Sequence, residues 1–217
     1  MRLKHFSFYL IAISSMFIFG SCGKDDTKTP ATDYAPMTAS STWTYQTAPS
    51  GTYTLTSTNR DTTINGKTFH VFTNTNSNVG NNYMGKSGND YYRFGILPGI
   101  APTGFDETYL KDNLDVNGTW VVTQNATAPG IPTPIPVNLT YTITEKGVQK
   151  VVSGTTYSNV IHVKLNISAL GISGGNGDFY YSGGVGLIES TLVINANPAF
   201  GIQASNQTQT LTNYSIK

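Results

Sequence analysis

The sequence has little charge, almost no cysteine and few histidines. Charged residues make up 12% of the 217 residues, Cys22 is the single cysteine, and there are 3 histidines. A single cysteine excludes a disulfide within the chain, so the fold depends on its core. Lysines and arginines are scattered singly, which excludes the basic stripe of a nucleic-acid-binding protein. Common nucleophile-elbow, zinc-helix and phosphate-loop motifs are absent, so the sequence predicts neither an enzyme nor a cofactor.

The first residues have the layout of an export signal. Arg2 and Lys4 precede an uncharged, mostly apolar run over residues 6–20, shorter than the roughly 20 apolar residues of a membrane-spanning helix. Gly20-Ser21-Cys22 resembles a lipobox, with Phe19 where most lipoboxes have leucine. We therefore expect residues 1–21 to be a lipoprotein signal peptide. Cys22 would carry acyl chains such as palmitate, which anchor a protein to a membrane without spanning it. An ordinary signal peptide with an incidental cysteine is the alternative.

The residues after Cys22 refine the expected location. Gly23-Lys24-Asp25-Asp26 is similar to the acidic signal that exports lipoproteins of the Bacteroidota through the outer membrane. We expect a lipid anchor in the outer membrane with the protein at the cell surface; a periplasm-facing protein is the alternative. Residues 22–39 contain few large apolar side chains and include Pro30 and Pro36, which predicts a flexible tether.

Residues 40–217 are rich in strand and turn formers. Threonine and tyrosine favour strands, and asparagine and glycine favour turns. No long stretch has apolar residues at helical spacing. Hairpin turns, each joining two strands, are predicted at Asn65-Gly66, Ser87-Gly88-Asn89, Lys146-Gly147, Ser153-Gly154 and Ser182-Gly183-Gly184. The sequence thus predicts a single all-β domain of antiparallel hairpins that form a curved sheet, a half-barrel or a sandwich.

Three segments do not match the strand pattern. Residues 97–114 contain prolines and glycines, which predicts an irregular connection with a helical turn near residues 107–112. Residues 128–136 contain four prolines and lack most backbone donors, which indicates a surface crossover or a sheet edge. Residues 174–178, Gly-Gly-Asn-Gly-Asp, resemble a calcium repeat but are interpreted as a hairpin turn.

Metal-binding patterns are weak. Asn113-x-Asp115-x-Asn117-Gly118, with Gln124 at the twelfth position, has the outline of a calcium loop. The pattern supplies one carboxylate, so we predict a turn at the start of a strand. His70 and His162 lie in predicted strands, and they would form a metal site only if the fold brought them together with a carboxylate. We expect no metal.

Two further sets of residues could have a function. A carboxylate-dependent hydrolase would need two facing carboxylates about 5–10 Å apart, and the spacing does not favour one. Its candidates are Asp106, Glu107, Glu145 and Glu189. Neighbouring tyrosines should place one ring on each face of a strand, and the outward rings could form a ligand surface. The candidates for that surface are Tyr91, Tyr92, Tyr180 and Tyr181.

The C-terminal half resembles a pattern in outer-membrane or surface lipoproteins of the Bacteroidota. The matching residues are Gly-x-x-Tyr-x-Asn-Val-Ile-x-Val over 154–163 and Tyr-Tyr-x-x-Gly-Val-Gly-Leu-Ile over 180–188. The resemblance covers about a quarter of the chain and implies a curved antiparallel sheet of sequential hairpins. The resemblance implies no catalytic or ligand-binding residue.

The sequence therefore predicts a surface-anchored, non-catalytic binding or structural lipoprotein. One hypothesis is that an apolar ligand binds on a concave face of the sheet. The alternative is an accessory lipoprotein that binds a glycan or a protein through exposed tyrosines. An apolar ligand would need a hollow lined by aliphatic and aromatic side chains, whereas a glycan would need several exposed rings in one plane.

Overall fold

Alternating inward and outward side chains organise the chain into strands. The computed structural model describes residues 32–49, 51–76, 80–97, 101–128, 131–198 and 202–217, which belong to one unit, Thr32–Lys217. Among these residues, no helix is long and apolar enough to span a membrane. The strands are β1 (Thr42–Ala48), β2 (Gly51–Ile64), β3 (Lys67–Asn74), β4 (Asn82–Ser87), β5 (Asp90–Leu97), β6 (Ala101–Lys111), β7 (Thr119–Ala128), β8 (Ile131–Val152), β9 (Thr155–Ala169), β10 (Ile172–Ser182), β11 (Gly186–Ile194) and β12 (Ser205–Ser215).

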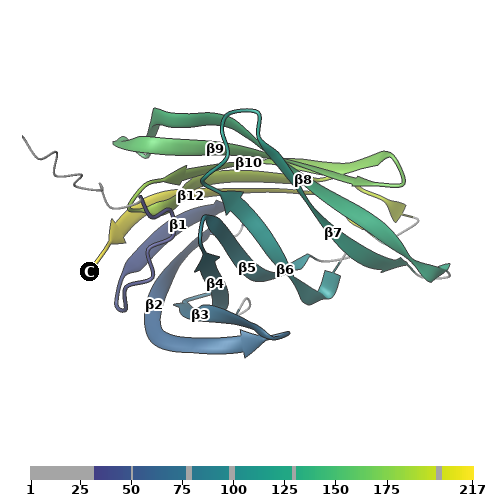
Figure 1. The fold of residues 1–217 in the computed structure, drawn as a ribbon, viewed down its shortest axis with the longest axis horizontal. Coiled ribbons are helices and arrows are strands. Elements are labelled where there is room, and N and C mark those ends of the chain that lie inside the picture. Colours follow the sequence, from purple (N-terminus) through teal and green to yellow (C-terminus); the bar gives the residue numbers. More distant parts are fainter. Residues whose placement is uncertain (1–31, 50, 77–79, 98–100, 129–130, 199–201) are drawn as a thin grey trace, which may run out of the picture. The chain divides into compact units, whose positions relative to one another are not determined.

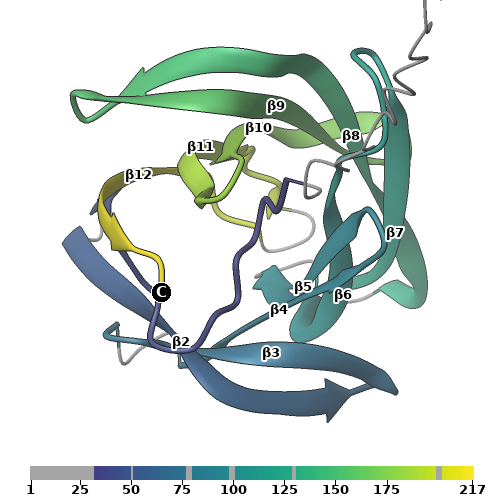
Figure 2. The ribbon, with the colours of Figure 1, turned by 60° about the vertical axis from the view of Figure 1, so that its left-hand side comes forward.

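All twelve strands form one antiparallel sheet, so the all-β prediction is confirmed. Their order is β6-β5-β4-β3-β2-β1-β12-β11-β10-β9-β8-β7. Strands that are consecutive in the chain pair with each other, except β6 with β7, and β1 pairs with β12 in the middle of the sheet. The two edge strands, β6 and β7, are therefore consecutive in the chain. Figure 1 and Figure 2 show the sheet curling around on itself until these edges approach each other.

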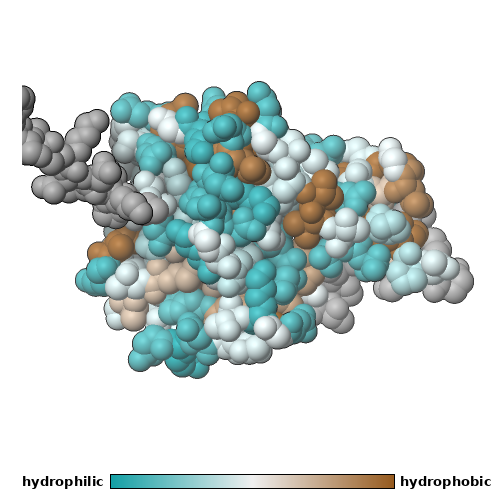
Figure 3. All heavy atoms as spheres, viewed as in Figure 1, coloured by the Kyte–Doolittle hydropathy of each residue, from teal (hydrophilic) through white to brown (hydrophobic). Residues whose placement is uncertain are grey.

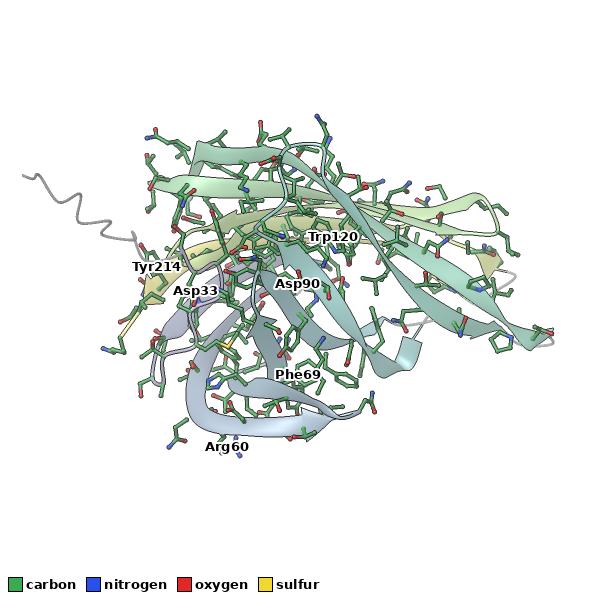
Figure 4. The ribbon with its side chains drawn as sticks, in the orientation of Figure 1. Asp33, Arg60, Phe69, Asp90, Trp120 and Tyr214 are labelled. Atoms are coloured by element: carbon green, nitrogen blue, oxygen red, sulfur yellow. The ribbon has the colours of Figure 1, made fainter. Side chains whose placement is uncertain are left out.

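Side chains connect the two edges of this nearly closed, barrel-like sheet. Trp120 of β7, labelled in Figure 4, donates from Nε1 to the Thr108 carbonyl oxygen of β6 at 2.7 Å. Its ring stacks on Tyr141, with centroids 5.1 Å apart. The Tyr141 hydroxyl donates to Glu107 of β6. The closure thus depends on side-chain contacts where the backbone ladder ends.

The segment that precedes β1 packs against the inner side of the sheet. This strap, residues 32–41, crosses the space that the sheet surrounds (Figure 2). Tyr34 and Ala35 are buried. The Asp33 carbonyl accepts from Gly184 N at 2.6 Å, and the Met37 carbonyl accepts from the Ser57 hydroxyl at 2.8 Å. The prediction of a tether over residues 22–39 is therefore corrected for 32–39, because Tyr34 and Ala35 supply enough apolar surface to fix this part of the chain.

Several predicted hairpins are confirmed. Asn65 and Gly66 have φ angles of 52° and 78°, and Ser153 and Gly154 have 49° and 79°. Paired positive φ values are typical of the type I′ turns that match strand twist. The Ser87-Gly88-Asn89 and Ser182-Gly183-Gly184 turns also lie between paired strands. One face of β9 is buried as well; it comprises Ile161, Val163, Leu165 and Ile167.

The prediction of a turn at Lys146-Gly147 is wrong. β8 continues through this point, and its register with β9 shifts between Lys146 and Val148. Gly147 has a φ of 73°, a conformation that lets a strand take up an extra residue as a β-bulge. The glycine therefore bends a single long strand, which lets β8 follow the curvature of the sheet.

The prediction of an irregular connection with a helical turn over residues 97–114 is also wrong. Residues 101–111 form β6, the edge strand beside β5. Phe105, Glu107 and Tyr109 alternate as buried residues, which is the period of a strand. Pro102 is tolerated because an edge strand has one side without ladder hydrogen bonds.

The proline-rich segment is a sheet edge, as one of the two predicted alternatives states. Residues 131–136 pair with β7, and pairing with β9 begins only at Val137. Pro132, Pro134 and Pro136 therefore lie where β8 has a partner on one side, so their missing N–H groups break no second ladder.

Residues 174–178 lie within β10 instead of forming the predicted hairpin turn. The turn is at Leu170-Gly171, both with positive φ. A Cβ atom on Gly175 would lie 2.2 Å from the Val193 carbonyl oxygen, and one on Gly177 would lie 2.8 Å from the Phe179 ring. These glycines thus permit close approach of a neighbouring strand and ring.

Candidate functional site

The sheet encloses a cavity of about 580 Å³. About eight strands already surround enough space for side chains to fill, so a sheet of twelve leaves room even with the strap inside. Every strand except β7 contributes to the wall, which is mainly aromatic and aliphatic. Representative wall residues are Tyr45, Phe72, Leu139, Leu165, Phe179 and Tyr181. Both the volume and the apolar lining are typical of small-molecule sites.

The cavity is closed on one side by the strap and reaches the surface elsewhere. Tyr34, Ala35 and Pro36 of the strap form part of its wall. Asn81 and Ile96 also line it and are exposed, Ile96 by 65%. The face drawn in Figure 3 is mostly hydrophilic or neutral, with separate apolar patches. The exposed lining residues therefore place an opening of the cavity beside β4 and β5.

One ion pair interrupts the apolar wall. Arg93 and Glu107 are opposite each other in the β5–β6 ladder and both line the cavity. Arg93 Nε donates to Glu107 Oε2 at 2.5 Å, and the other carboxylate oxygen accepts from Tyr141. Burial lowers the pKa of Arg93, but the charge and hydrogen bond of Glu107 outweigh burial and raise this pKa above its ordinary value. The guanidinium therefore stays charged inside the sheet.

Tyrosines surround this ion pair. Arg93 Cζ is 5.7 Å from the centroid of the Tyr109 ring, and the rings of Tyr109 and Tyr181 are 5.4 Å apart. Tyr45 donates its hydroxyl to the Leu187 carbonyl at 2.9 Å. Burial raises the pKa of Tyr45, Tyr109 and Tyr181, although Arg93 partly opposes this for the last two. All three hydroxyls therefore remain protonated near neutral pH.

A second polar network has the order of a catalytic triad. Ser57 Oγ is 2.9 Å from His70 Nε2, and His70 Nδ1 is 2.8 Å from Asp61 Oδ1. These are the distances of a nucleophile, a base and an orienting carboxylate. However, Ser57 is only 1% exposed, and its hydroxyl donates to Met37 of the strap. The network therefore holds the strap to β2 and β3 and leaves no room for a substrate at Ser57.

The predicted carboxylates have different partners. Glu107 is buried in the cavity wall, whereas Asp106 is its neighbour on β6 and has an unpartnered Oδ1 among the described residues. Glu145 is 3.4 Å from His162, and Glu189 is 2.9 Å from Lys150. No described hydrogen bond or ion pair joins any two of these four carboxylates. Glu107, Glu145 and Glu189 therefore each contact a different basic side chain.

His70 and His162 belong to different networks. His162 is buried on β9, where its Nε2 lies 2.7 Å from Asp178 and its ring stacks on Tyr180 at 4.1 Å. His70 contacts Ser57 and Asp61 instead. Within the described ranges, no group of three or more histidine, cysteine or acidic residues is arranged to hold a metal ion. Asn117 and Gly118 form the predicted turn before β7, with Asn117 N donating to the Ile143 carbonyl at 2.7 Å.

Most of the candidate tyrosine surface is buried. Tyr91, Tyr92 and Tyr181 are 0%, 8% and 3% exposed. Tyr92 packs edge-on against Phe69 beneath the Lys67 ammonium, and Tyr180 lies between His162 and the Lys150 ammonium. β-Bulges separate both tyrosine pairs, so simple alternation does not apply to them. Tyr214, at 38%, is the exposed aromatic side chain among the described residues.

The sequence did not locate the cavity, the ion pair in its wall or the Ser57–His70–Asp61 network. Among the candidate residues, Glu107 and Tyr181 line the cavity, and His70 belongs to the network. The pairing of Asp61 with His70 follows from the register of the Asn65-Gly66 hairpin and could have been found from it. Cys22, the predicted lipid attachment site, lies outside the described residues.

Fold and site together define an all-β protein whose sheet encloses a largely apolar cavity. No protein-family model and no curated protein sequence matches the chain. A crystal structure from Parabacteroides distasonis ATCC 8503, of a protein provisionally described as a lipoprotein, resembles it with a TM-score of 0.46 and 11% sequence identity. The match covers 85% of this chain and 99% of that chain. A similarity of this size carries no conclusion about ligand or activity.

Proposed function

We propose that this protein is a non-catalytic binding protein that holds one small, largely apolar molecule inside its sheet. The single observation that carries the proposal is the cavity of about 580 Å³ with its aromatic and aliphatic wall. An unfilled space of this size costs stability unless something binds there. The burial of Ser57, whose hydroxyl donates to the strap, supports a non-catalytic role.

A fluorescent apolar probe tests this proposal. The protein from residue 23 onward contains the whole unit Thr32–Lys217 and should take up one probe molecule per chain. Leu165→Trp places a larger side chain in the cavity wall and should abolish uptake, because the added ring fills the space. Asn166→Trp is the matched control, since Asn166 is the next residue and is exposed.

Thermal melting of both variants establishes that they are folded, since overpacking costs about 1–3 kcal/mol. Equal uptake by the unchanged protein and a folded Leu165→Trp variant would contradict binding in the cavity. Absence of uptake by the unchanged protein for every apolar probe would contradict the proposal as a whole.

We further propose that acyl chains on Cys22 anchor the protein in the outer membrane, with the cell surface as its location. The lipobox-like Gly20-Ser21-Cys22 and the acidic residues after it support this. Since the packed unit begins at Thr32, residues 23–31 span at most roughly 30 Å. Cys22→Ser should release the protein from the membrane fraction and remove labelling by radioactive palmitate; retention of both would contradict the anchor.

A further inference from the structure

The polar groups of the cavity wall are unbalanced between donors and acceptors. Among the described residues, the guanidinium of Arg93 has one hydrogen bond, from Nε to Glu107. Its two terminal Nη groups have no partner there. The hydroxyls of Tyr109 and Tyr181 line the same cavity and also have no hydrogen bond among the described residues. The wall therefore presents three groups with donors to spare.

Several acceptors among the wall residues are already used. Both oxygens of Glu107 accept hydrogen bonds, one from Arg93 and one from Tyr141. The Val185 carbonyl accepts from Trp43 at 2.7 Å, and the Leu187 carbonyl accepts from Tyr45 at 2.9 Å. A ligand that brings its own acceptor oxygens would satisfy the spare donors, which is the usual requirement for buried polar groups.

The position of Glu107 leaves the outer edge of the guanidinium accessible. Glu107 contacts Nε, the nitrogen nearest the backbone, so this hydrogen bond does not use the end-on edge formed by the two Nη groups. Arg93 is 35% exposed although it lies in the cavity wall, so a water-sized probe reaches it. A planar group with two oxygens fits such an edge in the bidentate geometry of arginine and carboxylate.

We infer that the molecule held in the cavity is an amphiphile with a carboxylate head, bound by Arg93 together with the Tyr109 and Tyr181 hydroxyls. This inference rests on the proposed function and names the chemical class of its ligand. The apolar chain lies along the aliphatic wall formed by residues such as Leu139 and Leu165. The charge-assisted hydrogen bonds to Arg93 fix the head and thereby the orientation of the ligand.

Calorimetric binding of three twelve-carbon probes tests the inference. Dodecanoate, 1-dodecanol and methyl dodecanoate share an apolar chain and differ at the head. We expect dodecanoate to bind about tenfold more tightly than the other two, because its head alone accepts charge-assisted hydrogen bonds from Arg93. In Arg93→Met/Glu107→Gln, which removes both charges, this preference should disappear while dodecanol binding is retained. Arg60→Met is the matched control, because Arg60 is exposed on β2 and should leave all three affinities unchanged.

The outcomes separate the two proposals. Equal binding of acid and alcohol by the unchanged protein would overturn the carboxylate inference and leave the apolar cavity standing. Failure of all three probes to bind, together with failure of the fluorescent probes above, would overturn the proposed function itself. If the double variant does not fold, Tyr109→Phe and Tyr181→Phe replace it, since each removes one hydroxyl only. Each should weaken dodecanoate several-fold and spare dodecanol; unchanged selectivity in both would overturn the inference.

Discussion

The Arg93–Glu107 pair and the Ser57–His70–Asp61 network differ in what their groups have left to bind. Ser57 and His70 use their polar atoms on each other, on Asp61 and on the strap. Arg93 uses one nitrogen and lines a cavity. Ser57 is therefore enclosed by its partners, whereas the ion pair lies in the wall of the cavity in which we propose that a ligand binds. Free hydrogen-bonding capacity beside free space, more than residue type, indicates a site.

The largest effect should come from breaking the ion pair. Glu107→Ala removes the only hydrogen-bond partner of Arg93 among the described residues and leaves a charge in the wall. We expect the free energy of unfolding to fall by about 3 kcal/mol, the lower end of the range for a buried pair, because the Arg93 side chain is 35% exposed. Urea denaturation measures this.

The double variant Arg93→Met/Glu107→Gln should recover much of this loss, because neither charge then remains unpaired. A loss below about 0.5 kcal/mol in Glu107→Ala, the range of ordinary surface substitutions, would show that the pair is solvated and not part of an enclosed wall.

Alkaline pH should lower the free energy of unfolding through the buried tyrosines around the cavity. Burial raises the pKa of Tyr53 to about 12 and raises those of Tyr45 and Tyr181 well above the ordinary value. The folded state therefore favours the protonated phenol. This stability is fully present below about pH 10, where unfolded tyrosines are still protonated, and is lost as pH rises from there through the folded pKa values.

Each such tyrosine should lower the free energy of unfolding by about 1.4 kcal/mol per pH unit in this window. Urea denaturation at pH 8, 10 and 11 measures the slope. Tyr53→Phe should make the slope shallower. A free energy of unfolding that does not change over this range would contradict the burial of these phenols.

A smaller effect is expected from the triad-like network. Ser57→Ala removes the donor to the Met37 carbonyl, and an unsatisfied buried group costs about 1–3 kcal/mol. Thermal or urea unfolding measures the loss. Hydrolysis of p-nitrophenyl acetate should be at background for both forms. Turnover by the unchanged protein that Ser57→Ala abolishes would contradict the structural role.

Local patterns predicted much of the fold, and their failures have physical causes. Turn chemistry located the Asn65-Gly66 and Ser153-Gly154 hairpins because positive φ is a property of a few residues. Gly147 and Gly175 predict turns but lie within strands, because glycine also occurs in bulges and at close strand contacts. Pro102 argues against a strand over β6 in the sequence, although an edge strand accommodates proline.

The candidate site depends on contacts that no local pattern contains. The pairing of Arg93 with Glu107 needs the β5–β6 register, and the sequence pattern does not predict β6. The cavity depends on the pairing of β1 with β12 and on the number of strands in one sheet. Neither is encoded in the alternation of neighbouring residues, so an apolar ligand could be proposed from the sequence but not located.

Native mass spectrometry of the protein from residue 23 onward, before and after organic extraction, tests the central claim most directly. Without Cys22 the chain has no acyl anchor, so any added mass belongs to a bound molecule. The account predicts one molecule per chain, removed by extraction and restored by incubation with a bacterial lipid extract. A mass equal to that of the bare chain in all three samples would contradict a ligand-binding cavity.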